Sequence, residues 1–172
     1  MAKSRDYLYK DVMNISGEKI GYIKDLLVDF GKSEVVGFKI NPYKIMKKGF
    51  NVLKDDIIYQ RDQLIVKDTA KSKFIEFSSI MNMYVVDKCF NILGLVSEII
   101  FDDEEFTIKG ISIRDYNLWS MFKSRRILLL KELIIGEEYI FYIGENPRIT
   151  LECMPIIGNR KNHYRDVYYE KA

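Results

Sequence analysis

Residues 20–40 decide the fold, because the segment IGYIKDLLVDFGKSEVVGFKI returns further along the chain. Residues 93–113 read LGLVSEIIFDDEEFTIKGISI, at a constant offset of 73 residues and without a gap. Gly21 falls on Gly94, and Asp25 falls on Glu98. A match at a fixed period is typical of a repeated structural unit. The sequence therefore predicts two copies of one small unit within the 172 residues.

The apolar residues of the repeated segment are spaced at one point as in a helix. Ile20, Ile23 and Leu26 recur at three-residue intervals, which taken alone indicates a helix. Flanking glycines and β-branched residues favour a strand instead, and a β-bulge shifts the alternation by one residue. The second copy has the same spacing, so we predict a bulged strand in both. Residues 36–40 then alternate as expected of a half-buried strand.

The rest of the chain is arranged around these two copies. We expect a first unit at residues 1–70, a linker at 71–83, a second unit at 84–145 and a C-terminal extension at 146–172. Residues 1–6 are polar and are expected to fray. Phe74, Phe77, Met81 and Tyr84 recur at three and four residues, which indicates either a short amphipathic helix or a turn. Residues 149–154 are expected to form one more strand.

A second stretch also repeats, but at a different offset. Residues 52–58 match residues 129–135 at an offset of 77, which implies four extra residues in the second connector, 114–126. Short strands with turn signals at close intervals indicate a small barrel or sandwich. The pattern therefore predicts an all-β protein.

Composition excludes several classes of protein. The chain has 27 basic and 25 acidic residues, a balance that does not by itself imply a nucleic-acid partner. No apolar run approaches the ~18 residues of a membrane span, and the N-terminus lacks the apolar core of a signal peptide. Cys89 and Cys153 do not have metal-site spacing. These features predict a cytoplasmic protein.

The repeated block resembles the PRC-barrel family. The resemblance is carried by Ile/Leu-Gly-x-Ile/Val-x-Asp/Glu-Leu/Ile, then Gly-Phe/Ile-x-Ile, and in the first copy by LKDDI at residues 53–57. It covers about residues 7–68 and 84–143, and it implies two tandem small PRC-like β-barrels with a C-terminal extension. The family includes the cytoplasmic part of the photosynthetic reaction-centre H subunit, the C-terminal half of a bacterial ribosome-maturation factor and stand-alone bacterial members. The resemblance implies a bacterial docking or scaffold module, because the family has no shared active site.

No catalytic constellation is visible in the sequence. His163 is the one histidine, and neither a phosphate-binding glycine loop nor a nucleophile elbow occurs. The acidic run 102–105 lacks calcium-loop spacing and is expected to be a hairpin tip. Asp25 and Glu98 are either paired catalytic carboxylates or, as we favour, anchors for backbone N–H groups at the bulge. We therefore expect a non-enzymatic protein with no cofactor or metal.

Two basic connectors occupy the same place in the two units. The candidate partner-binding residues within them are Lys47, Lys48, Trp119, Phe122, Lys123, Arg125 and Arg126. Basic and aromatic side chains together suit an acidic protein surface or, as the alternative, RNA or the ribosome. An ordinary solvated connector is the simpler interpretation, and the charges alone favour it. Another protein is the expected partner, and nucleic acid is the less favoured one.

The two units are also expected to pack against each other. Each alone is small enough to be marginally stable, and a short linker lets both use the same face. We therefore predict an intramolecular pseudo-twofold pair, with a homodimer of the whole chain as a further alternative.

Overall fold

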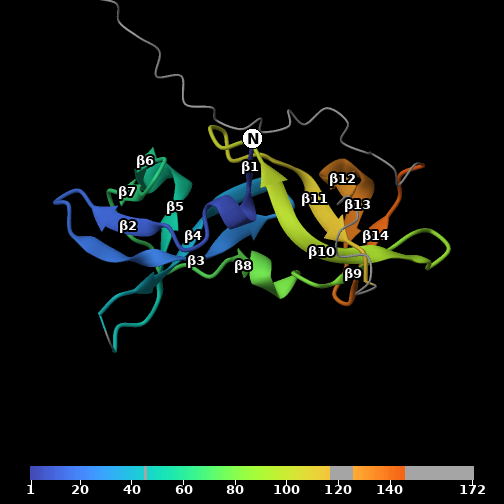
Figure 1. Cartoon of the computed structure of the whole chain (residues 1–172), viewed down its shortest axis with the longest axis horizontal. Helices are drawn as coiled ribbons and strands as arrows, with labels where there is room; N and C mark the ends of the chain where they lie inside the picture. The colour runs from blue at the N-terminus through green and yellow to red at the C-terminus, as the bar shows by residue number, and fades with distance from the viewer. Residues whose placement is uncertain (45, 117–125, 146–172) are drawn as a thin grey trace, which may run out of the picture.

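The computed structural model describes residues 1–44, 46–116 and 126–145, which form two curled seven-stranded sheets (Figure 1). The first contains β2 (Asp11–Asn14), β3 (Lys19–Asp29), β4 (Glu34–Pro42), β5 (Phe50–Leu53), β6 (Ile57–Gln60), β7 (Leu64–Val66) and β8 (Ile75–Glu76). The second contains β9 (Tyr84–Val86), β10 (Ile92–Phe101), β11 (Ile108–Arg114), β12 (Arg126–Leu129), β13 (Leu133–Ile135), β14 (Tyr139–Tyr142) and β1 (Ala2–Lys3).

Both sheets have the same strand order. The path β5-β4-β3-β2-β7-β6 of the first sheet corresponds to β12-β11-β10-β9-β14-β13 of the second. Within the described ranges the helical segments are 3-10 turns of three residues: η1 (Ser4–Asp6), η2 (Lys54–Asp56), η3 (Phe77–Ser79) and η5 (Leu130–Glu132). The prediction of an all-β fold built from two small barrel-like units is confirmed. The expected strand at residues 149–154 lies outside the described residues.

The predicted bulge explains the helix-like spacing. The pairing of β3 with β4 shifts between Ile23 and Asp25, and the pairing of β10 with β11 shifts between Val96 and Glu98. A bulge places one extra residue in its strand, so side chains three residues apart both face the core. Ile23 is accordingly fully buried, as is Leu26.

The two matched acids lie at these bulges. Asp25 is buried, and its carboxylate accepts the backbone N–H groups of Leu26 at 2.8 Å and Ser78 at 3.2 Å. Glu98 is also buried, and it forms an ion pair of 3.3 Å with the guanidinium of Arg5. Asp25 therefore anchors backbone N–H groups as predicted, and Glu98 forms an ion pair with a side chain from the N-terminal segment.

Each sheet takes its seventh strand from the two-residue segment that precedes the other strands of its neighbour sheet: β1 precedes β2 but joins the second sheet, and β8 precedes β9 but joins the first. β1 pairs with β10, so that Ala2 faces Phe101, and β8 pairs with β3, so that Ile75 faces Val28. The offset of 73 relates the two pairings: Ile75 lies 73 residues after Ala2, and Phe101 lies 73 residues after Val28. In Figure 1, β1 lies beside β10, and β8 lies beside β3.

These pairings correct two expectations. The prediction that residues 1–6 fray is wrong, because Ala2 and Ser4 are buried and the Ser4 hydroxyl accepts the N–H of Ile99 at 3.3 Å. The free edge of β10 offers the hydrogen bonds that a polar segment needs. The linker contains the short strand β8 and the turn η3, so the turn interpretation holds and no α-helix forms there.

The second offset also needs correction. Gly37 pairs with Leu53, and Gly110 pairs with Leu129, which gives an offset of 76 between β5 and β12 instead of 77. The second connector is therefore longer by three residues. The sequence match was misplaced because residues 127–130 read ILLL, where a shift of one residue costs no apolar match.

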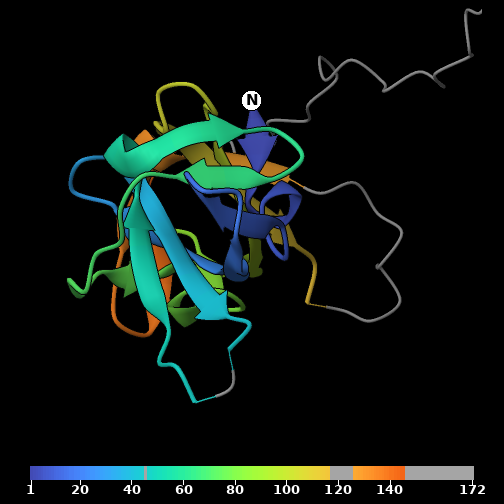
Figure 2. The ribbon, with the colours of Figure 1, turned by 90° about the vertical axis from the view of Figure 1, so that its left-hand side faces the viewer.

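The tips of two hairpins join the sheets. The N–H of Val35 donates to the carbonyl of Phe106 at 2.8 Å, and the N–H of Ile108 donates to the carbonyl of Ser33 at 2.7 Å. These two bonds are again related by the offset of 73, and Glu34 bridges Thr107 between them. In Figure 2 the first sheet lies in front of the second along the long axis of the molecule.

The two halves share one hydrophobic core. A cluster of four aromatic rings lies at the centre, with Tyr7 stacked on Phe38 at 5.0 Å and tilted against Phe101 at 5.3 Å. Phe106 lies 6.1 Å from both Phe38 and Phe101. Since these rings come from both halves, burial of each half depends on the other.

Tyr7 makes the free energy of unfolding depend on pH in the alkaline range. Burial raises the pKa of Tyr7 to about 12, helped by the negative charges of Asp103 and Asp6. In the unfolded chain the phenol ionises near pH 10, so the unfolded state loses its proton first. We expect the free energy of unfolding to be unaffected by Tyr7 below pH 10 and to fall by about 1.4 kcal/mol per pH unit from pH 10 to 12.

Urea denaturation at pH 9, 10 and 11 measures this slope. Tyr7→Phe should remove it, whereas Tyr9→Phe, at a site 77% exposed, should keep it. The same slope in Tyr7→Phe and in the wild-type protein would contradict the assignment.

Candidate functional site

A cleft of about 1080 Å³ lies on the first sheet, between the β4–β5 connector and the segment 69–76. Figure 2 shows the connector as the loop that projects from the end of β4. Seven lysines and two glutamates line the cleft: Lys19, Lys39, Lys44, Lys47, Lys48, Lys71 and Lys73, with Glu18 and Glu76. Phe50 and Phe74 add apolar surface.

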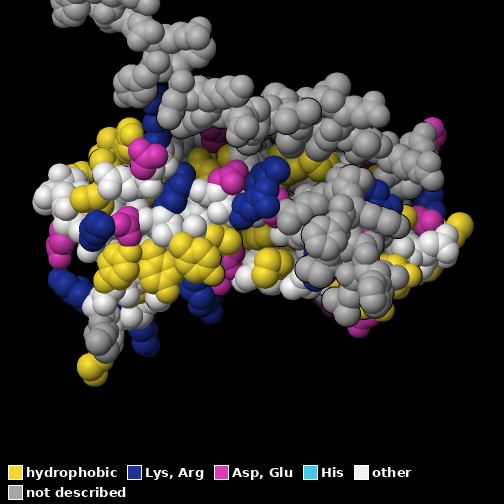
Figure 3. Space-filling view, viewed as in Figure 1, with side chains coloured by type: hydrophobic (Ala, Val, Ile, Leu, Met, Phe, Trp, Pro, Cys, Tyr) yellow, Lys and Arg dark blue, Asp and Glu magenta, His cyan; other side chains and the backbone are white. Residues whose placement is uncertain are grey.

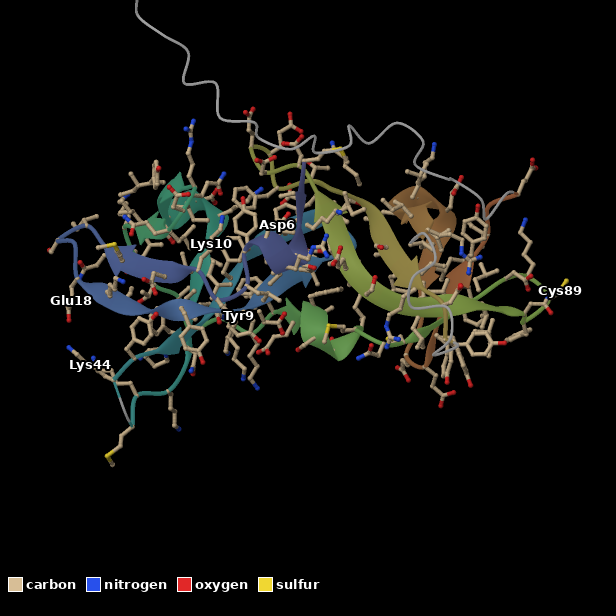
Figure 4. All side chains as sticks on the ribbon, viewed as in Figure 1. Asp6, Tyr9, Lys10, Glu18, Lys44 and Cys89 are labelled. Atoms are coloured by element: carbon tan, nitrogen blue, oxygen red, sulfur yellow. The ribbon has the colours of Figure 1, made fainter. Side chains whose placement is uncertain are left out.

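Some of these lysines are neutralised and others are not. Lys44 lies 3.1 Å from Glu18, and Lys39 lies 3.5 Å from Glu76. The hydrogen bond from Lys44 holds the pKa of Glu18 below its usual value, with a smaller contribution from Lys47. In Figure 4 the side chains of Glu18 and Lys44 turn toward one another at the end of the first sheet.

Four of the cleft lysines form no ion pair with a carboxylate within the described part of the chain. They are Lys47, Lys48, Lys71 and Lys73, which come from the connector and from the segment after β7. Ammonium groups gathered in a concave site repel one another and focus the field, which raises the local concentration of anions. The cleft is therefore suited to bind a negatively charged ligand.

Asn51 lies at the cleft with an unused acceptor. It is 4% exposed, and its backbone pairs with Ala70 through hydrogen bonds of 2.9 and 2.8 Å. Its amide nitrogen donates to the carbonyl of Ser72, whereas its Oδ1 has no donor among the described residues. The counterpart in β12 is Ile127, so the strand itself does not require a polar side chain here. Buried polar atoms are almost always paired, and a bound donor would satisfy Oδ1.

The predicted site residues fall into three groups. Lys47 and Lys48 are exposed and line the cleft. Arg126 instead lies half-buried in β12, where its guanidinium donates to the carbonyl of Leu93 and, at 3.2 Å, to Asp115. The other four predicted residues, Trp119, Phe122, Lys123 and Arg125, lie outside the described residues.

Sequence reasoning missed Lys71 and Lys73. They lie in the sequence KDTAKSK of residues 67–73, at the end of the predicted first unit and the start of the predicted linker. What brings them to the connector is the bridge between Asn51 and Ala70, which folds the segment back along β5. A single bridge of this kind produces no periodic pattern in the sequence, so the position of Lys71 and Lys73 could not be predicted from it.

The described residues hold no group of three or more His, Cys, Asp or Glu side chains placed to bind a metal. None of the described helical segments has the length and hydropathy of a membrane span. The functional groups that line the cleft are mainly lysine ammonium groups, together with some apolar surface.

A strongly curled sheet that carries such a cleft belongs to the class of small β-barrel modules. Residues 1–73 match the family model of the PRC-barrel domain. The matched segment begins before β1 and ends at Lys73, so it includes Lys71 and Lys73 of the cleft. None of the curated proteins compared with the chain matches it. The resemblance inferred from the sequence is thus confirmed for the first unit, and for the second unit it stays a prediction.

Proposed function

We propose that the protein is a non-enzymatic docking module that holds an acidic segment of another protein in the lysine-lined cleft. One observation carries this proposal: seven lysines face two glutamates around a single cleft. Carboxylates of a partner would relieve the mutual repulsion of the unpaired ammonium groups. Complementary charge of this kind sets specificity and speeds association more than it adds affinity.

The size of the cleft favours a peptide segment. Its volume of about 1080 Å³ lies at the upper limit of the ~300–1,000 Å³ found for small-molecule sites. The cleft is also bordered by two extended segments, the connector and the chain from Thr69 to Glu76. An extended chain fits between such walls with its side chains directed to both.

Charge reversal in the cleft tests the proposal. In fluorescence anisotropy with a labelled hexaglutamate peptide, the triple variant Lys48→Glu, Lys71→Glu and Lys73→Glu should bind about 100-fold more weakly, since each reversal removes on the order of 1 kcal/mol. Higher salt should weaken binding to the wild-type protein.

A matched variant controls for net charge. Lys88→Glu, Lys109→Glu and Lys131→Glu change the same number of exposed charges on the second sheet. This variant should bind the peptide within about threefold of wild type, because exposed charges beyond a Debye length are screened. Equal losses in the two triple variants would place binding outside the cleft and contradict the proposal.

RNA, or a ribosomal partner, is the second candidate. One observation favours it: Phe50 and Phe74 line the same cleft as the lysines, and aromatic rings beside cations bind single strands. A labelled dodecauridine distinguishes the two candidates. Tighter binding of the oligonucleotide than of hexaglutamate, lost in the cleft variant and with a steep dependence on salt, would replace the docking proposal by RNA binding.

A further inference from the structure

A row of three tyrosines lies on the first sheet outside the cleft. The rings of Tyr9 and Tyr22 are 6.1 Å apart, and those of Tyr22 and Tyr43 are 5.8 Å apart. Tyr9 is 77% exposed and Tyr43 is 48% exposed. Figure 3 shows hydrophobic side chains gathered as a row on this face of the first sheet, and Figure 4 places Tyr9 beside β3.

The protein holds these rings in place by their polar ends. The hydroxyl of Tyr22 accepts a hydrogen bond of 2.7 Å from the amide of Asn41. The hydroxyl of Tyr43 donates to the carboxylate of Asp11. The hydroxyl of Tyr9 has no partner among the described residues. Since two of the three rings are fixed at their edges, the row presents a preformed aromatic surface to solvent.

The fold does not require this row. Tyr9 has a left-handed backbone with φ of 68°, and its counterpart Asn82 has φ of 69°. Asparagine adopts that conformation at lower cost than an aromatic residue, and Leu95 takes the place of Tyr22. The second sheet forms the same strands without the two tyrosines. A strained and exposed ring at Tyr9 is therefore better explained by binding than by stability.

The row and the lysine-lined cleft are continuous. Asp11 accepts from Tyr43 through one oxygen and lies 2.5 Å from the ammonium of Lys19 through the other. Lys19 lines the cleft, as do Pro42 and Lys44 on either side of Tyr43. One extended ligand can therefore occupy both.

We propose that the tyrosine row binds a proline-containing stretch in polyproline II conformation, which continues the acidic segment held in the cleft. This inference rests on the proposed docking function. Polyproline II has three residues per turn and rises about 3.1 Å per residue, so one turn is about 9.3 Å long. The three rings, in steps of 6.1 and 5.8 Å, therefore offer contacts along about one turn of such a chain. Aromatic-lined surfaces recognise this conformation, and the free hydroxyl of Tyr9 can donate to one of its solvated carbonyls.

Nucleic acid fits the row less well. A base inserted between two rings needs a separation of about 6.8 Å, twice the ~3.4 Å stacking distance, and both spacings are shorter. A phosphate chain that left the cleft would also pass Asp11. The pKa of Asp11 is lowered by hydrogen bonds from Lys19 and Tyr43, so its carboxylate is ionised and would repel phosphates. A neutral peptide backbone meets no such repulsion.

The test compares three labelled peptides: hexaglutamate, hexaglutamate joined to hexaproline, and hexaglutamate joined to three Gly-Ser repeats, with the extension placed at either end. The measured quantity is the affinity gained from the hexaproline over the Gly-Ser extension. We expect a gain of about tenfold in at least one order. The variant Tyr9→Asn with Tyr22→Leu, which copies the second sheet, should abolish this gain without lowering the melting temperature.

A matched variant and an oligonucleotide complete the experiment. Tyr84→Asn with Tyr139→Leu removes two exposed tyrosines of the second sheet and should keep the gain. Binding of hexaglutamate without any gain from hexaproline overturns this inference and leaves the docking function standing. Failure of every peptide to bind overturns both. Dodecauridine binding that is lost in the Tyr9 and Tyr22 variant assigns the row to nucleic acid and also overturns the inference.

Discussion

Residues 1–73, expressed without the rest of the chain, are expected to form a homodimer with exchanged N-terminal strands. In the whole protein β1 pairs with β10, and β3 pairs with β8, through contacts related by the offset of 73. A lone fragment retains β1 and β3 but loses both partners. Two copies restore the pairing, because the β1 segment of one copy can take the position of β8 on β3 of the other.

The dimer should be much less stable than the intact protein. In a dimer of the first unit, Val28 takes the place of Phe101, and Ser33 takes the place of Phe106. Each buried aromatic ring that is lost removes about 1.5–3 kcal/mol of burial. We therefore expect dissociation to be coupled to unfolding, with a melting temperature that rises with protein concentration.

Sedimentation equilibrium and melting at several concentrations measure this behaviour. Residues 7–73, which lack β1 and η1, serve as the control and should neither fold nor dimerise. A folded monomer of residues 1–73, as stable as the intact chain, would show that the first unit does not depend on the exchange.

Gly37→Ala and Gly110→Ala are each expected to cause a large loss of stability. A Cβ at Gly37 would overlap the carbonyl oxygen of Val52, and a Cβ at Gly110 would overlap that of Leu128. Both obstacles are backbone atoms of a paired neighbouring strand, so neither can rotate away. We expect each variant to lose about 3 kcal/mol or more of unfolding free energy, the upper end for overpacking.

Urea denaturation gives the comparison, with Gly31→Ala as the control. An added Cβ at Gly31 approaches only the side chain of Asp29, in an exposed turn. This variant should stay within about 0.5 kcal/mol of wild type. Because the core is shared, Gly37→Ala should also unfold in a single transition. Two separate transitions, or a loss as small as that of the control, would contradict this account.

The sequence predicts the long strands well because they repeat and because burial leaves a pattern. The bulge is readable from Ile20, Ile23 and Leu26, since one extra residue shifts the alternation wherever it occurs. The pairing of β1 with β10 and of β8 with β3 could not be predicted from the sequence. Ala2–Lys3 and Ile75–Glu76 are strands of two residues, which are too short to show any periodicity. The positions of these two short strands are set by the unpaired edges of β10 and β3, and these edges form only after the long strands have paired.

The candidate site is predictable in part for the same reason. Lys47 and Lys48 form a visible cluster within one connector. Tyr9, Tyr22 and Tyr43 are far apart in the sequence, and only the pairing of β2 with β3 and of β3 with β4 brings their rings together. No motif links positions whose proximity depends on strand register.

The pairing of β1 with β10 also sets an order of events during synthesis. Ala2 leaves the ribosome early, but its partner Phe101 is made almost a hundred residues later, which takes about 5 to 20 s at ~5–20 residues per second. Until then the N-terminal segment has no partner strand in its own chain, and until residues 75–76 are made β3 exposes the edge that β8 covers. In that interval neighbouring nascent chains on one messenger can pair with these edges. The spacing of ribosomes on the messenger should therefore influence how much of the product is correctly closed within one chain.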